Sequence, residues 1–265
     1  QGTADAVRQG LRHIEPFESD YILILSGDQL YQMDFAEMLD NHKALGADIS
    51  VATIPVAQRE APEFGILKSD NGLITSFIEK PKKEVLGEWV SDTGLEMQNA
   101  GRNYLASMGI YIFNRNLLFD LLRTEFKDAT DFGKEIIPQS IIKYKVASYQ
   151  YSGYWTDIGN IHSFFEANID LTKDIPDFNM FDSDRTIYTR PRMLPPGKIS
   201  GTTLEKTLIA EGSIINASRV ENSVIGIRSR VGHGSTIVST YIMGSDYYET
   251  LADIASAAEK GIPLL

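Results

Sequence analysis

Apolar and polar positions follow two periods along the first two thirds of the chain, one typical of helices and one of buried strands. Over residues 4–14 the apolar side chains recur at spacings of three and four, which predicts a helix with Thr3 as its N-cap. Continuous apolar runs at 21–25 and 47–56 predict buried strands, and Asp34 is placed to cap a helix between them. This strand-helix-strand order predicts an α/β domain with a mostly parallel central sheet.

A β-hairpin is predicted where two alternating runs flank Asn71-Gly72. This dipeptide readily takes the positive φ values of a type I′ turn. A polar segment of about 25 residues follows the hairpin. Two further strands and two further helices are then predicted, at 108–113 and 147–151 and at 117–126 and 134–143. Helices and strands therefore continue to alternate to about residue 171.

A different pattern begins after a linker. Residues 181–197 carry three prolines and no apolar period. Beyond them, four apolar residues recur every six positions: Ile225, Val231, Ile237 and Met243. Ile209 and Ile215 share this spacing, although the phase slips by two before Ile225. A period of six residues marks the turns of a parallel β-helix, so we predict a few coils of that fold.

Length and composition agree with two folded parts. A chain of 265 residues exceeds a comfortable single core, and 43% hydrophobic residues are enough to fill two. We therefore divide the chain into an α/β domain over 1–175, a linker over 176–200 and the start of a β-helix over 201–265.

Charge and cysteine usage exclude several classes of function. A formal net charge of -11 disfavours binding to nucleic acid, which depends on Lys and Arg displacing counterions. The absence of cysteine excludes disulfides and thiolate metal sites, and it fits a reducing compartment. The apolar runs are too short to span a bilayer, so no membrane role is expected.

Two acids are candidates for one divalent metal site. Asp28 follows the apolar run 21–25, at the carboxyl end of a predicted strand, where open α/β sheets bind ligands. Asp157 lies at the end of a second β-rich run, in Tyr154-Trp-Thr-Asp-Ile-Gly159. Mg²⁺ prefers one or two carboxylates together with water and phosphate oxygens, which suits such a pair. Spacing alone supports equally well a turn-forming role for Asp28.

A second candidate site follows the predicted hairpin. Lys80 offers a point charge for the phosphate of a sugar phosphate, and Glu79 offers a carboxylate for sugar hydroxyls. From spacing alone, a solvated lysine and a surface acid are the more common outcomes for such positions. The four histidines show no metal spacing, and we treat them as structural: His13, His42, His162 and His233.

Seven short motifs in order resemble those of the ADP-glucose pyrophosphorylase family, the glucose-1-phosphate adenylyltransferases of bacterial glycogen and plant starch synthesis. They are Gln1-Gly-Thr-Ala-Asp-Ala-Val7, Ser26-Gly-Asp-Gln-Leu-Tyr31, Phe77-Ile-Glu-Lys-Pro81, Ala106-Ser-Met-Gly-Ile-Tyr111, Asp131-Phe-Gly-Lys-Glu-Ile-Ile-Pro138, Tyr154-Trp-Thr-Asp-Ile-Gly159 and Met243-Gly-Ser-Asp-Tyr-Tyr-Glu-Thr250. The resemblance implies a Rossmann-like nucleotidyltransferase domain followed by a partial left-handed parallel β-helix. It also implies an allosteric homotetramer or heterotetramer in the bacterial cytoplasm or, in a plant, the plastid.

The resemblance also implies roles for individual residues. ATP and glucose 1-phosphate would give ADP-glucose and pyrophosphate, with Mg²⁺ on Asp28 and Asp157 and with Lys80 as the third catalytic residue. The positions matching the family's glucose 1-phosphate pocket are Gly65, Glu79, Lys80, Ser107, Tyr111, Asp131, Phe132 and Trp155. Those matching the segment that approaches the nucleotide base are Gln1, Gly2, Thr3 and Ala4.

Two alternatives to adenylyl transfer remain open. One is a sister sugar nucleotidyltransferase that uses another base. The motifs at 131–138 and 246–250 favour adenylyl transfer over this alternative. The other is a non-catalytic regulatory subunit or scaffold of the same fold. The resemblance places the family's glycine-rich loop before Gln1 and further β-helix after Leu265. We therefore expect this chain to be an internal piece that is inactive alone.

Overall fold

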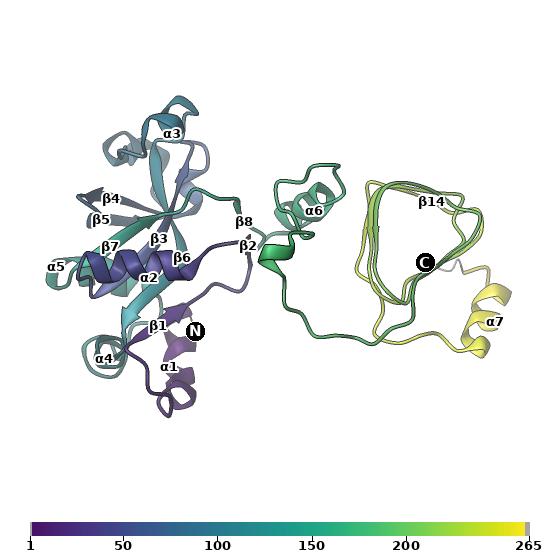
Figure 1. Ribbon diagram of the computed structural model, residues 1–265, viewed down its shortest axis with the longest axis horizontal. Helices are drawn as coiled ribbons and strands as arrows, with labels where there is room; N and C mark the ends of the chain where they lie inside the picture. The colour runs from purple at the N-terminus through teal and green to yellow at the C-terminus, as the bar shows by residue number, and fades with distance from the viewer. Residues whose placement is uncertain (1, 263–265) are drawn as a thin grey trace. The chain divides into compact units, whose positions relative to one another are not determined.

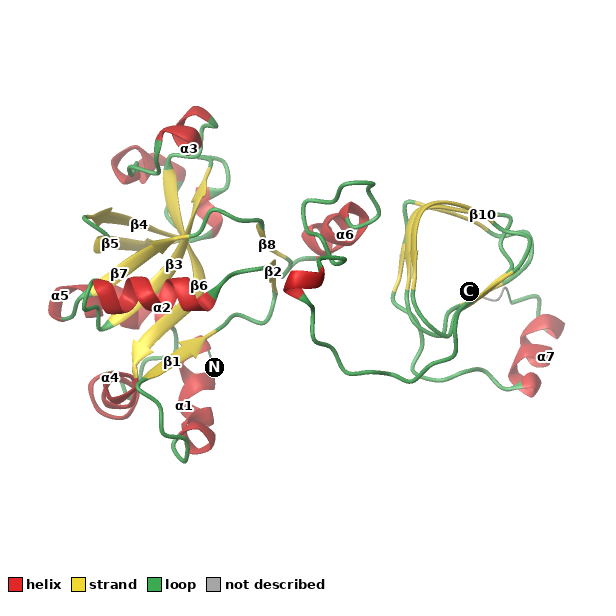
Figure 2. Ribbon diagram, viewed as in Figure 1, coloured by secondary structure: helices red, strands yellow, loops and turns green. Residues whose placement is uncertain are grey.

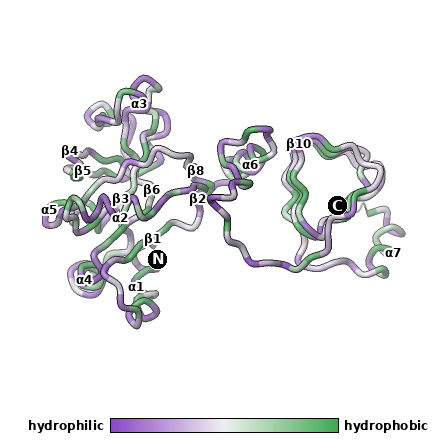
Figure 3. The backbone as a smooth tube through the Cα atoms, viewed as in Figure 1, coloured by the Kyte–Doolittle hydropathy of each residue, from purple (hydrophilic) through white to green (hydrophobic). Residues whose placement is uncertain are grey.

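The computed structural model describes residues 2–262, and its contacts divide the chain into two compact units (Figure 1). The first unit comprises the residues up to Gly27 together with Met33–Gly153. The second unit comprises Asp28–Gln32 together with the chain from Tyr154 onward. Hydrophobic residues concentrate on the central strands of the first unit and on the coils of the second (Figure 3).

The first unit is a central sheet with helices packed around it. The sheet has the order β1-β6-β3-β7-β5-β4. The strands are β1 (Tyr21–Ile24), β3 (Ile49–Val56), β4 (Gly65–Asp70), β5 (Leu73–Glu79), β6 (Tyr104–Asn114) and β7 (Val146–Gln150). The helices are α1 (Thr3–Ile14), α2 (Phe35–Ala44), α3 (Leu95–Asn99), α4 (Arg115–Asp120) and α5 (Ile137–Lys143), with 3₁₀ segments at Ala61–Glu63 and Lys83–Trp89 and π-helical turns at Leu121–Glu125 and Phe132–Ile136.

The α/β class is confirmed, but the sheet is mixed rather than mostly parallel. Strands β3 and β7 pair in parallel, whereas β6 runs antiparallel to β1, β3 and β4. Strands β1 and β3 do point the same way across α2, as the strand-helix-strand pattern predicts, but β6 lies between them. The β4–β5 hairpin adds two more antiparallel pairings. The position of β6 between β1 and β3 therefore makes these pairings antiparallel, and the apolar pattern of the sequence does not indicate that position.

Local signals for turns and caps are mostly confirmed. Asn71 and Gly72 take φ values of 48° and 78° in the turn between β4 and β5. The Asp34 side chain accepts a hydrogen bond from the amide of Ala36, 2.8 Å away, and caps α2. The predicted N-cap of α1 is wrong, because Gly2 precedes the helix and Thr3 is its first residue. The Thr3 hydroxyl instead accepts a hydrogen bond from the Phe132 amide, as described below.

His42 on α2 is a buried histidine, 1% exposed, in a polar niche of the first unit. Its ring nitrogens lie 2.8 Å from Ser50 Oγ and 3.2 Å from Asn114 Oδ1. Burial lowers the pKa of His42 below its ordinary value of about 6.5, and the opposing influence of Asn114 and Asp48 does not cancel it. His42 thus takes the structural role that the sequence predicts.

We expect this burial to make stability depend on pH. A histidine whose pKa is lower in the folded chain stabilises the fold fully above pH about 6.5, and that contribution is lost as pH falls through the folded pKa. Urea unfolding at pH 7.5 and 5.5 should therefore show a fall in the free energy of unfolding. A His42→Gln variant should show a smaller fall between the same two pH values. Equal falls in both proteins would assign the pH dependence to other groups.

The second unit begins with a short ladder and continues into a β-helix that is triangular in cross-section (Figure 1). The ladder pairs β2 (Gln29–Tyr31) with β8 (Trp155–Asp157). Helix α6 (Ile161–Asp170) follows β8, and a 3₁₀ turn lies at Ser183–Arg185. The β-helix strands are β9 (Lys198–Ile199), β10 (Thr203–Ile209), β11 (Ile214–Ile215), β12 (Arg219–Ile225), β13 (Arg230–Val231), β14 (Thr236–Val238) and β15 (Tyr241–Ile242), and α7 (Leu251–Glu259) comes last.

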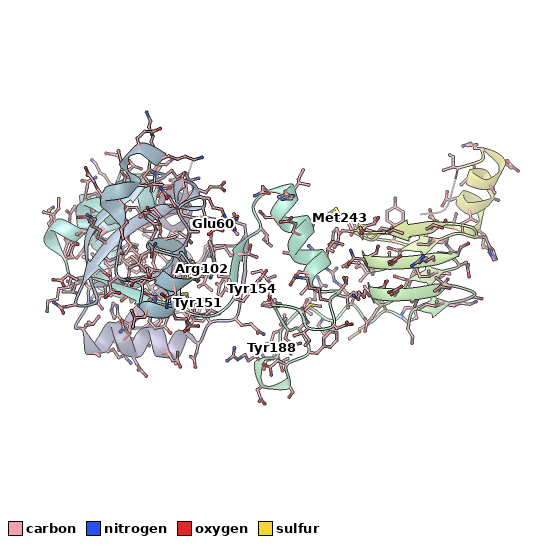
Figure 4. All side chains as sticks on the ribbon, turned by 90° about the horizontal axis from the view of Figure 1, so that it is seen from above. Glu60, Arg102, Tyr151, Tyr154, Tyr188 and Met243 are labelled. Carbon is pink, nitrogen blue, oxygen red and sulfur yellow. The ribbon has the colours of Figure 1, made fainter. Side chains whose placement is uncertain are left out.

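The β-helix is confirmed, with one correction to its predicted register. Parallel pairing stacks Ile209 on Ile225 and Ile225 on Ile242, so the second of these steps spans 17 residues rather than 18. Ile242 consequently packs against the core, while Met243 is 78% exposed at the rim of the coils (Figure 4). The Met243 carbonyl lies 2.3 Å from where a Cβ on Gly226 would be. Glycine is therefore required there.

None of the helices within residues 2–262 is long and apolar enough to cross a membrane.

Candidate functional site

The two predicted metal ligands lie side by side in the second unit. Strand pairing sets Gln29 opposite Asp157, and the amide of Ile158 donates to the Asp28 carbonyl at 3.0 Å. Asp28 thus directly precedes β2, at the same end of the ladder at which β8 ends with Asp157. Residues 129 positions apart in sequence are brought together by one short antiparallel ladder, as the strand-end positions of both acids suggested.

Gly159 defines the space between the two carboxylates. A Cβ built on Gly159 would lie 3.0 Å from Asp157 Oδ1 and 3.2 Å from Asp28 Oδ2, so both oxygens border one small volume that no side chain fills. The Gly159 amide donates to Asp157 Oδ1 at 2.8 Å and orients that carboxylate. The sequence pattern did not single out Gly159, although a glycine two residues after the acid in this motif was an available signal.

This pair of oxygens suits Mg²⁺ better than a metal that requires a full protein cage. Among the described residues, no group of three or more His, Cys, Asp or Glu side chains is arranged to hold a metal ion. Mg²⁺ keeps several waters and takes one or two carboxylates together with substrate phosphates. The donor set of Asp28 and Asp157, with Gly159 leaving room beside it, meets that preference.

Trp155, predicted for the sugar pocket, lies in the ladder with the acids. It pairs with Tyr31, and its indole nitrogen donates to Gln29 Oε1 at 3.0 Å. This hydrogen bond joins the Trp155 side chain on β8 to the Gln29 side chain on β2. The structure groups Trp155 with the candidate metal ligands in the second unit, whereas the other predicted sugar-pocket residues belong to the first unit.

The predicted sugar residues of the first unit converge on the Glu79 carboxylate. Gly65 pairs with Glu79 across the β4–β5 hairpin, and a Cβ on Gly65 would lie 2.8 Å from Glu79 Oε2. A Cβ on Gly133 would lie 2.9 Å from the same oxygen and 3.5 Å from Asp131 Oδ1. Two glycines from distant segments thus leave the space that Glu79 occupies. Gly133 is a further residue that the sequence analysis missed.

Tyr111 and Ser107 on β6 lie beside this carboxylate cluster. Ser107 hydrogen-bonds the Tyr111 side chain, and the charges of Glu79 and Asp131 act on it. Phe132 is buried against Tyr111, with ring centroids 5.5 Å apart. Burial is the main cause that raises the pKa of Tyr111, so its phenol stays protonated at neutral pH. A protonated phenol retains a hydrogen-bond donor for a polar ligand.

Burial also raises the pKa of Glu79, and the nearby Asp131 carboxylate raises it further. Lys80 and Lys134 oppose this shift by favouring the charged form. A carboxylate with a raised pKa is more basic and accepts hydrogen bonds from hydroxyl groups more strongly. Glu79 is therefore suited to bind a sugar hydroxyl.

Lys80 follows β5 in a conformation uncommon for lysine. Its φ of 46° lies in the left-handed region, and its amide donates to the Phe64 carbonyl at 3.0 Å. This hydrogen bond extends the hairpin by one position past the Gly65–Glu79 pair and holds the turn that follows. The Lys80 side chain is exposed, as binding an incoming phosphate requires.

The start of α1, predicted to approach a nucleotide base, is hydrogen-bonded to the segment that carries Asp131. The amides of Ala4 and Asp5 donate to the Thr130 carbonyl at 2.9 and 3.3 Å, and the Phe132 amide donates to Thr3 Oγ1 at 3.1 Å. The Ala4 amide therefore already has a partner within the chain. Gly2 contacts Thr130 so closely that a Cβ would lie 2.4 Å from its carbonyl oxygen, and the predicted Gln1 lies outside the described residues.

Substituting Gly133 should separate binding from stability. Gly133→Ala places a methyl group against Glu79 Oε2, and we expect KM for the sugar phosphate to rise about 10-fold because a hydrogen bond to the charged carboxylate is weakened. The free energy of unfolding should not fall, since alanine favours helical backbone. Gly87→Ala is the matched control, because no described atom lies within 4 Å of its Cβ. Equal KM values for both variants would remove Gly133 from the site.

Comparison with known families agrees with this geometry. Residues 1–174 match the family described as nucleotidyl transferase. Residues 192–265 match the GLGC left-handed parallel beta-helix domain. The first match contains both acids and the Glu79 cluster, and the second contains the β-helix strands β9 to β15. The chain belongs to the nucleotidyl transferase family, as a GlgC-like sugar-phosphate nucleotidyltransferase.

Proposed function

We propose that this chain is part of a glucose-1-phosphate adenylyltransferase, which joins ATP and glucose 1-phosphate into ADP-glucose and releases pyrophosphate in glycogen or starch synthesis. The observation that carries the proposal is the pair of carboxylates, Asp28 and Asp157, that border one volume at Gly159. The choice of adenylyl transfer is supported by the β-helix match and by the family motifs at 131–138 and 246–250.

The reaction requires an oxygen of the sugar phosphate to attack the α-phosphorus of the nucleotide while the bond to pyrophosphate breaks. Catalysis of this kind depends on positioning and on neutralising charge rather than on a covalent intermediate with the protein. Asp28 and Asp157 would hold Mg²⁺, which when bound supplies positive charge to the triphosphate. Lys80 supplies a second positive charge for the sugar phosphate.

The other residues of the first unit orient the sugar. Glu79 accepts hydrogen bonds from sugar hydroxyls, with its basicity raised by burial and by Asp131. Tyr111 provides a hydroxyl donor beside it, and Ser107 is hydrogen-bonded to the same tyrosine side chain. Thr3 links the nucleotide segment to Phe132, so both substrate-binding segments share one hydrogen-bonded network.

A nucleotide panel tests the proposal. Pyrophosphate release would be measured with glucose 1-phosphate and Mg²⁺ and, in turn, ATP, UTP, CTP, GTP and dTTP, on this chain and on the full-length protein. Preference for ATP is the expected result. Preference for another nucleotide would identify a sister transferase, and no release with any of them from the full-length protein would favour the regulatory scaffold.

A further inference from the structure

Helix α6 connects the two candidate metal ligands to the β-helix within the second unit. It begins after Asn160, which caps it by accepting from the Ser163 amide at 2.9 Å, three residues beyond Asp157. The backbone between Asp157 and this cap includes Gly159, whose amide orients the carboxylate. Figure 2 shows α6 between the β2–β8 ladder and the coils of the β-helix. Any displacement of the first turn of α6 therefore reaches Asp157 directly.

The β2–β8 ladder cannot hold the acids in place unaided. It pairs three residues with three, and an isolated two-stranded ladder is at best marginally stable in water. Packing against a larger element must supply the missing stability. Helix α6 is the element that follows the ladder and packs on the β-helix strands β12 and β15.

Two specific contacts fasten α6 to the coils. The ring of Phe164 meets Tyr241 edge to face, with centroids 5.0 Å apart. Just after α6, the hydroxyl of Thr172, which is 7% exposed, lies 3.0 Å from Asn222 Oδ1 and 2.7 Å from the Ile169 carbonyl. Asn222 has a φ of 45° and donates to Ser239 Oγ at 3.1 Å, which ties this contact to the next coil.

We propose that the β-helix positions the metal-binding carboxylates through α6, with Phe164 and Thr172 as the positioning residues. The proposal rests on the proposed role of Asp28 and Asp157 in holding Mg²⁺. Ligands of a metal must be held to within about half an ångström, and the residues that pack behind them set that precision. The coils are held by a buried column of apolar side chains, including Val220, Ile225 and Val231. They therefore provide the rigid base that the short ladder lacks.

Metal binding tests the proposal without relying on turnover. The chain contains two tryptophans, so a Trp89→Phe background leaves Trp155, two residues from Asp157, as the fluorophore. Mn²⁺ would be titrated as a quencher into this chain. We expect Phe164→Ala and Thr172→Val each to raise the Mn²⁺ Kd about 3- to 10-fold, as expected for the loss of one packing or hydrogen-bonding contact. Thr172→Ser, which keeps the hydroxyl, should restore the original Kd.

Matched controls separate positioning from general destabilisation. Thr207→Val removes a hydroxyl that bonds within the β-helix, to the carbonyls of Glu205 and Val220, and should leave the Mn²⁺ Kd unchanged. Phe164→Leu keeps an apolar side chain if the alanine variant fails to fold. Parental Kd values in Thr172→Val and in Phe164→Ala, or in Phe164→Leu where the alanine variant does not fold, would overturn the positioning proposal alone. Unchanged quenching in Asp28→Asn would overturn the metal assignment itself, and the positioning proposal with it.

Discussion

Asp28→Asn should lower kcat for nucleotidyl transfer by about 10³-fold in the full-length protein, with little change in the free energy of unfolding. Asparagine preserves the shape of the side chain but removes the negative charge beside Asp157. A divalent metal contributes several kcal/mol of charge stabilisation in the transition state, and each 1.4 kcal/mol corresponds to a factor of ten in rate. Steady-state pyrophosphate release at saturating substrates measures the loss, and urea unfolding checks the fold.

The control for this prediction is another acid of the second unit. Asp174 is exposed in the segment after α6, and Asp174→Asn makes the same chemical change away from Gly159. We expect it to retain the parental kcat. Near-normal turnover in Asp28→Asn would exclude Asp28 from the mechanism, and an equal loss in both variants would point to overall charge rather than to a metal site.

Elements defined by local chemistry were predictable from the sequence. The α1 pattern, the Asp34 cap and the Asn71-Gly72 turn depend on neighbours within a few residues, and the structure has all three elements. The order of the sheet depends on where β6 inserts, and a fully buried strand reads the same whichever partner it takes. Parallel and antiparallel pairings were therefore not distinguishable in advance.

In the β-helix, too, the sequence predicted the core residues better than the strand register. Ile225, Val231 and Ile237 occupy the core as their period of six predicts. The next step fails because the coil from Ile225 to Ile242 is one residue short of three periods, so Met243 turns outward. The stacking offset is 16 residues at the Ile215–Val231 pair and 17 at the Arg219–Thr236 pair, so the extra residue lies in the turn after Val231, for which the apolar pattern gives no signal.

In the candidate site, the sequence singled out the two acids but not two of the glycines beside the predicted residues. Asp28 and Asp157 were paired because both follow β-rich runs, and the ladder does bring them together. Gly159 and Gly133 matter only through what a Cβ would meet, which is fixed by segments distant in sequence. The motif resemblance assigns Trp155 to the sugar pocket, and strand pairing sets it in the ladder that carries the two acids.

Lys80→Gln should raise KM for glucose 1-phosphate by about 10- to 100-fold and leave KM for ATP nearly unchanged. Glutamine retains length and hydrogen-bonding capacity but not the charge that pairs with a phosphate, and a charge-assisted hydrogen bond contributes about 1.5–3 kcal/mol. The Lys80 amide donates to the Phe64 carbonyl, and this backbone hydrogen bond does not depend on the side chain. The substitution therefore leaves the hairpin intact. Initial rates with each substrate varied in turn give both constants.

Lys82→Gln is the control for this prediction, because it removes a positive charge near Lys80 but outside the proposed site. Lys82 is also exposed and lies two residues farther along, outside the Gly65–Glu79 end of the hairpin. Lys82→Gln should leave both KM values as they are, because a charge placed in water beyond contact distance of the phosphate is largely screened. A loss confined to glucose 1-phosphate in Lys80→Gln alone would assign the sugar phosphate to Lys80. Equal losses for both substrates would contradict that assignment and indicate that Lys80 supports the fold of the hairpin instead.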